Sequence, residues 1–153
     1  MVNVSLKKLK GQFFDRQSVR DLMTTAEIEF LSAFGAVVRT TAKQSMKSRE
    51  GVSPPGTPPY SHAGQLRGLI YFAMDATSLS VVIGPTLFSE AKTHGNERPV
   101  PALHEYGGVA WRDGKKRQYP ARPFMGPAFR EWEGKTDEIW AIAAKYRRKK
   151  NAA

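Results

Sequence analysis

The chain has no cysteine, which excludes disulfides, thiolate nucleophiles and cysteine-ligated metal sites. Histidine is scarce as well, with three residues, His62, His94 and His104, that lie far apart in the sequence. A helical metal site needs two ligands about one turn apart, and no pair of histidines has that spacing. We therefore expect no metal site.

The patterns of the common catalytic sites are also missing. Ser61 and His62 are adjacent, but they do not lie on a strained elbow between a strand and a helix. Neither Gly56 nor Gly64 is followed by the Lys-Ser/Thr pair of a phosphate-binding loop. The few carboxylates are not paired. We expect no enzymatic activity, no catalytic residues and no bound cofactor.

Long apolar runs are absent. No stretch approaches the roughly 20 apolar residues of a membrane span. The first 16 residues hold two short apolar patches and lack the apolar core of a signal peptide. We expect no contact with a membrane and synthesis in the cytosol.

Acidic residues are in the minority, 14 against 24 Lys and Arg, which gives a net charge of +10. Such a charge favours nucleic acid or acidic protein partners. No recognition helix or other DNA-reading motif is evident. The cations can make non-specific, salt-sensitive phosphate contacts, or they can simply form solvated faces. They occur in four blocks, Lys7 to Lys10, Lys43 to Arg49, Lys115 to Arg117 and Lys145 to Lys150.

The 153 residues fit one domain with its own core. We divide the chain into an N-terminal arm (1–14), a single domain (15–145) and a basic C-terminal tail (146–153). The alternation of Val2, Val4 and Leu6 is also compatible with a short edge strand in place of an arm.

A long helix is predicted from about Ser18 to Ser48, with Ser18 and Asp21 resembling a capping box. Gly35 inside it favours the close approach of a neighbouring element. The predicted apolar stripe recurs at steps of three and four residues. It consists of Val19, Leu22, Met23, Ala26, Phe30, Ala33, Phe34, Val37, Val38 and Thr41.

After this helix, prolines at 54, 55, 58 and 59 predict a stiff loop over residues 51–64. Alternating apolar residues then predict a hairpin of strands Leu69–Asp75 and Ser78–Gly84. Leu79 is expected on one face with Val81 and Ile83. Residues 85–101 form a second long loop.

The remaining elements are short until the end of the chain. We expect one helical turn over Pro101–Tyr106, closed by Gly107-Gly108. A second hairpin follows, with strands Val109–Trp111 and Gln118–Ala121 around the turn Asp113-Gly114 and with Lys115, Lys116 and Arg117 at or near its tip. A last helix is predicted from Pro127 to Lys150, where Gly134 weakens it or marks a bend. Its apolar stripe contains Phe129, Trp132, Thr136, Ile139, Trp140 and Ala143. Helices around a small antiparallel sheet make an α+β fold.

The stretch from Ala102 to Phe129 combines many constrained backbone positions with polar groups. In Tyr119-Pro-Ala-Arg-Pro-Phe124, each proline fixes its own φ and extends the residue before it. A rigid connection into the last helix is one interpretation. The other is an interface in which an exposed Arg122 meets a carboxylate such as Glu105. The candidate subunit-interface residues are His104, Glu105, Tyr106, Arg122 and Phe124.

Four segments together resemble a known family. They are the long first helix, the Pro-rich loop leading to Gly64-Gln-Leu-Arg67, the hairpin ending Val82-Ile-Gly84, and Leu103-His-Glu-Tyr-Gly-Gly108 followed by Tyr119-Pro-Ala-Arg-Pro-Phe-Met125. In this order they resemble the tail-completion proteins of long-tailed bacteriophages, also described as head–tail joining, neck or minor tail proteins. The likeness covers about residues 15–145.

The resemblance implies a structural virion protein, assembled in the host cytoplasm, with no chemistry of its own. It implies a homo-oligomeric ring between head-completion or portal-side proteins and tail-terminator or tail-tube proteins. A non-specific DNA-binding protein is the alternative. The candidate contacts with DNA or an acidic partner are Lys115, Lys116, Arg117, Arg147, Arg148, Lys149 and Lys150.

Overall fold

The computed structural model describes residues 16–86 and 99–151. The predicted arm and most of the predicted loop 85–101 lie outside these residues. The fold is α+β, as the sequence predicted. The elements are α2 (Arg16–Ser45), α3 (Gln65–Gly68), β1 (Ile70–Asp75), β2 (Ser80–Pro85), α4 (Val100–Tyr106), β3 (Gly108–Arg112), β4 (Lys115–Tyr119), α5 (Met125–Trp132) and α6 (Thr136–Asn151).

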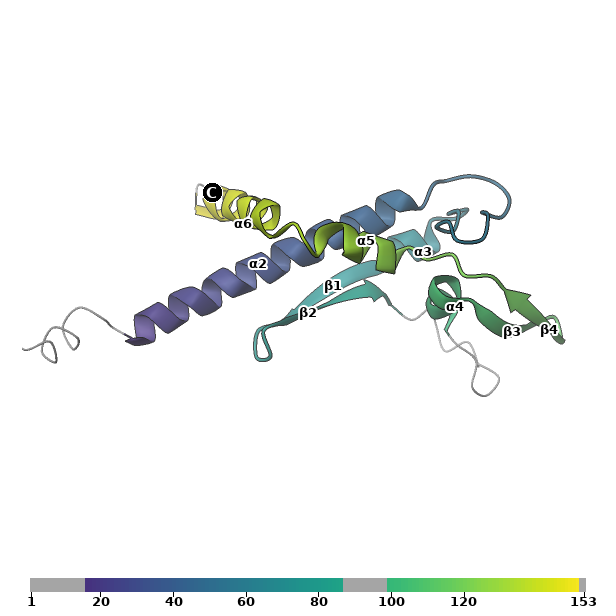
Figure 1. Cartoon of the computed structure of the whole chain (residues 1–153), viewed down its shortest axis with the longest axis horizontal. Helices are drawn as coiled ribbons and strands as arrows, with labels where there is room; N and C mark the ends of the chain where they lie inside the picture. The colour runs from purple at the N-terminus through teal and green to yellow at the C-terminus, as the bar shows by residue number, and fades with distance from the viewer. Residues whose placement is uncertain (1–15, 87–98, 152–153) are drawn as a thin grey trace, which may run out of the picture.

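The long helix α2 is the central element, because it packs against β1, β2, α5 and α6 (Figure 1). It begins by Arg16, so the predicted capping box at Ser18 is wrong, and it ends three residues before the predicted Ser48. Leu22 and Met23, early in the predicted stripe, are 61% and 59% exposed. No described element covers that end of the helix, so helical spacing alone did not make these residues core.

The buried core forms where α2, β1 and α5 meet. One cluster is made of Val38, Ala42, Met46, Ile70, Phe124 and Ala128. A second cluster, of Ala33, Ile139 and Ala143, lies where α6 crosses α2. The predicted packing of Phe30 and Phe34 is confirmed. The Phe30 ring lies 4.8 Å from that of Trp140, and Phe34 meets Phe129 edge-on at 5.6 Å.

The first predicted hairpin is present as β1–β2, with Phe72 opposite Ile83 and Met74 opposite Val81. Leu79 is not in a strand, contrary to the prediction; it lies in the turn at φ 47. Gly35 of α2 faces this hairpin. A Cβ added there would lie 2.6 Å from Cδ2 of Phe72, which confirms the predicted close approach.

The predicted single last helix is two helices. The helical hydrogen-bond pattern is interrupted around Gly134, where the Lys135 N–H donates to the Trp132 carbonyl at 3.1 Å. Helix α6 then crosses α2 near Phe30 and Ala33. Glycine inside a helix costs about 1 kcal/mol relative to alanine, and here the packing of α5 and α6 on different parts of α2 requires the break.

The second hairpin, β3–β4, forms a separate two-stranded sheet. It stands at one end of the molecule, far from the N-terminal end of α2 (Figure 1). The expected small sheet is therefore two ribbons, one packed on α2 and one projecting from the body.

Candidate functional site

The short helix α4 starts at Val100, one residue before the predicted Pro101, and it ends at Tyr106 and is closed by Gly107, as the sequence predicted. Gly107 adopts φ 66 and ψ −171, and its N–H donates to the Leu103 carbonyl at 2.9 Å. Few residues other than glycine adopt this conformation. The turn directs the chain from α4 into β3 and holds α4 beside the segment 119–126.

Glu105 caps the N-terminus of α5. Its Oε2 accepts hydrogen bonds from the N–H groups of Phe124 at 2.9 Å and Met125 at 3.0 Å, and its Oε1 accepts one from Gly126 at 2.7 Å. The next residue, Pro127, has no N–H. One carboxylate therefore satisfies every available donor at this helix start, where the helix dipole also favours a negative charge.

Arg122 ties the same segment to the Pro-rich loop. Its guanidinium Nε donates to the Ser53 carbonyl at 2.9 Å, and its backbone N–H donates to the His104 carbonyl at 2.6 Å. The Gly56 N–H donates to the Ala121 carbonyl at 2.8 Å. The Pro-rich loop, α4 and the segment before α5 thus form one interlocked unit, which we call the elbow (residues 51–64, 100–108 and 119–126).

The interface interpretation of this stretch needs correction. Arg122 is 9% exposed and is not the exposed group that was predicted, and no ion pair joins it to Glu105. Phe124 is a core residue, 1% exposed. Glu105 and His104 are half-buried and hold the elbow together. Tyr106, 72% exposed, is the one predicted interface residue that displays most of its side chain.

Burial in the elbow lowers the pKa of His104 below its usual value of 6.5, and the positive charge of Arg122 lowers it further. The folded chain therefore binds a proton at His104 less readily than the unfolded chain does. The contribution of His104 to stability is fully present above the pKa of the unfolded chain, and it is lost as pH falls below about 6.5.

We expect the melting temperature to fall between pH 7 and pH 5, roughly the range in which an unfolded histidine gains its proton. His104→Gln removes the titrating group and should flatten this part of the profile. Thermal melts of both proteins at several pH values test it, with His62→Gln as an exposed control. An unchanged slope in His104→Gln would contradict the assignment.

The candidate cations occupy two places. Lys115, Lys116 and Arg117 lie in β4 beside the turn Asp113-Gly114, and all three are exposed. The turn is where the sequence predicted it, but β4 begins at Lys115 and not at the predicted Gln118, so Lys116 and Arg117 are strand residues. The Asp113 carboxylate is 3.8 Å from both Arg112 and Arg117.

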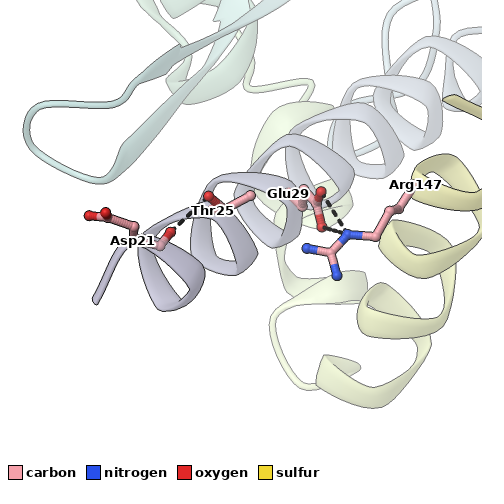
Figure 2. Close-up of polar contacts among 4 residues, drawn as sticks. All are labelled: Asp21, Thr25, Glu29 and Arg147. Atoms are coloured by element: carbon pink, nitrogen blue, oxygen red, sulfur yellow. Dashed lines mark hydrogen bonds and ion pairs between the residues drawn. The ribbon is translucent and has the colours of Figure 1, made fainter. Parts of the chain in front are cut away.

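The other cations are at the end of α6. Arg147, a candidate contact with DNA or an acidic partner, is 42% exposed, and its Nε lies 3.0 Å from both carboxylate oxygens of Glu29, which links α6 to α2 (Figure 2). In the same view Thr25 donates to the backbone carbonyl of Asp21 one turn earlier. Arg148 and Lys149 are exposed, whereas the side chain of Lys150 lies outside the described part of the chain.

Sequence reasoning missed two long-range contacts of the elbow and core. The cap on α5 comes from Glu105, about 20 residues upstream. The signal for it was the missing local cap: no acidic residue and no Ser/Thr cap stands at the start of α5, so its N–H groups need an acceptor from elsewhere. The Trp132 indole N–H donates to Thr41 at 2.8 Å. The Ser53 hydroxyl is buried with no partner among the described residues, so Ser53 contributes through its backbone.

Within residues 16–86 and 99–151, no three His, Asp or Glu side chains gather as metal ligands would. None of the helices in that part of the chain combines the length and apolar character needed to cross a bilayer. An open cavity of about 280 Å³ lies between α2, α6 and the β1–β2 turn, lined by Glu27, Phe30, Leu31, Leu79 and Trp140. Comparison with protein-family models, with curated proteins and with solved structures gave no match.

Proposed function

We propose that this chain is a structural subunit of a tailed-phage virion, a neck or tail-completion protein that forms a homo-oligomeric ring between the head-completion or portal side and the tail tube. It is not an enzyme in this proposal. It is assembled in the host cytoplasm and remains in the virion.

One observation carries the proposal. The segments on which the family resemblance rests, the Pro-rich loop, the Leu103–Gly108 stretch and the Tyr119–Met125 stretch, are distant in sequence but interlock in the elbow. Such a set of residues is expected where a rigid shape is the functional requirement. The polar groups of the predicted interface, Glu105 and Arg122, act inside the chain as a helix cap and a tie between segments.

In this proposal the elbow keeps the shape of the ring subunit fixed. It fixes the start of α5, and α5 in turn packs on α2 through Phe124 and Ala128. The surfaces available to neighbouring subunits and partners then include the exposed end of α2, Tyr106 and the projecting β3–β4 hairpin.

Deletion of the gene from the genome that encodes it tests this function. Electron microscopy should show filled heads and separate tails, and the gene supplied in trans should restore joined particles. Joined particles in the deletion strain would overturn the proposal. Electron microscopy of the purified wild-type chain provides the second measurement, in which closed rings are expected.

A further inference from the structure

The β3–β4 hairpin is a ribbon whose strands pack chiefly on each other. Its base is fixed to the elbow by the Gly107 turn, and its other end projects from the body (Figure 1). Four of the five residues of β4 are exposed. An isolated two-stranded hairpin is marginal in water, so a projecting ribbon of this kind is best explained by a partner that it contacts.

The strand register distributes four cations around this ribbon. Arg112 lies opposite Lys115, and Ala110 lies opposite Arg117, so these three cations share one face. Lys116 lies opposite Trp111 on the other face. Both faces of the ribbon therefore carry positive charge close to its tip.

This arrangement costs stability in the free protein. Like charges directly opposite each other in an antiparallel pair are destabilising, and Arg112 faces Lys115 in that way. Residues 112–117 hold four cations and Asp113, a local net charge of +3. Asp113 is itself 74% exposed, and exposed ion pairs contribute little. An anionic partner would relieve the repulsion.

The shape of the ribbon indicates which polyanion. The major groove of duplex DNA is about 12 Å wide and admits a two-stranded ribbon, whose strands are about 4.8 Å apart. A ribbon in that groove has a phosphate backbone along each of its two edges, and this one carries cations on both strands, Arg112 on β3 and Lys115, Lys116 and Arg117 on β4. We propose that the β3–β4 hairpin binds duplex DNA, with Arg112, Lys115, Lys116 and Arg117 contacting the phosphates.

This inference rests on the proposed function for its setting, since it names the DNA in the channel of the ring as a partner. The cations at the end of α6 do not compete as an explanation. Arg147 is held by Glu29, and Arg148 and Lys149 stand in the last turns of a helix, where positive charge favours the helix dipole. They provide a matched control with the same change in net charge.

The test measures binding of the full chain to a short fluorescent duplex of arbitrary sequence between about 50 and 200 mM salt. Four phosphate contacts predict a slope of log K against log salt of about −3.6. The double variant Lys115→Ala, Lys116→Ala should reduce this slope by about 1.8, which weakens binding roughly 60-fold at 0.1 M salt if the affinities converge near 1 M. The control Arg148→Ala, Lys149→Ala should stay within about threefold of the wild type under the same counterion-release relation.

Circular dichroism and the melting temperature of each variant verify that the fold is intact; Lys115 and Lys116 are exposed, so no loss is expected. Equal weakening in both double variants would overturn the inference, because net charge alone would then explain binding. Unchanged DNA affinity in the hairpin variant would overturn the inference too. If the hairpin variant then fails to form rings while the control variant still forms them, the hairpin contacts a protein partner and not DNA. These outcomes leave the particle-joining test untouched, so each proposal can fail separately.

Discussion

Gly107→Ala will lower the free energy of unfolding by about 3–5 kcal/mol, the largest effect we expect from a single substitution. At φ 66 and ψ −171 the backbone occupies a region that is almost restricted to glycine. An added Cβ would also lie 2.8 Å from the backbone N of Ala121 and 2.9 Å from the carbonyl O of Tyr119. Both atoms belong to the main chain of the elbow, so they cannot move aside without breaking its hydrogen bonds.

Chemical denaturation of the purified variant measures this loss. Gly114→Ala is the matched control, because Gly114 also has a positive φ, 71, but has no atom within 4 Å of an added Cβ. The control should cost only about 1–2 kcal/mol, from backbone strain alone. Similar losses in the two variants would show that the contact with residues 119–121 contributes nothing.

Glu105→Ala will cost about 2–4 kcal/mol, because three backbone N–H groups at the start of α5 lose their acceptor. These donors are partly buried, so water replaces the carboxylate incompletely. Glu105→Gln keeps one acceptor oxygen and places an amide N–H₂ against donors, so its loss should be intermediate. Hydrogen exchange of the Phe124, Met125 and Gly126 amides should accelerate in both variants.

Glu131→Ala is the matched control for the cap. Glu131 is exposed on α5 and should change stability by no more than about 0.5 kcal/mol. If Glu105→Ala unfolds at the same denaturant concentration as the control, the cap is not a stabilising contact. The same measurement separates the cap from an interface role, since an interface residue would change assembly and leave the stability of the monomer unchanged.

Local patterns predicted most of the elements. Period-two alternation identified β1–β2, the Asp113-Gly114 turn located the second hairpin, and the apolar stripe identified α2. These signals succeed because strands, turns and helices are determined by residues a few positions apart. The errors arose where neighbours far along the chain decide the outcome. The stripe of α2 continues through Leu22, but no described element covers it.

The elbow shows the same division between what local patterns determine and what distant neighbours decide. The composition and spacing of the chain determined that the stretch from Ala102 to Phe129 would be stiff, because prolines and glycines limit φ locally. Only the tertiary structure decided what the polar groups on it do. Arg122 reaches Ser53, 69 residues away, and Glu105 reaches the start of α5, so both are used inside the chain. Such contacts depend on how the loop, α4 and α5 pack together on α2, and no local pattern specifies that packing.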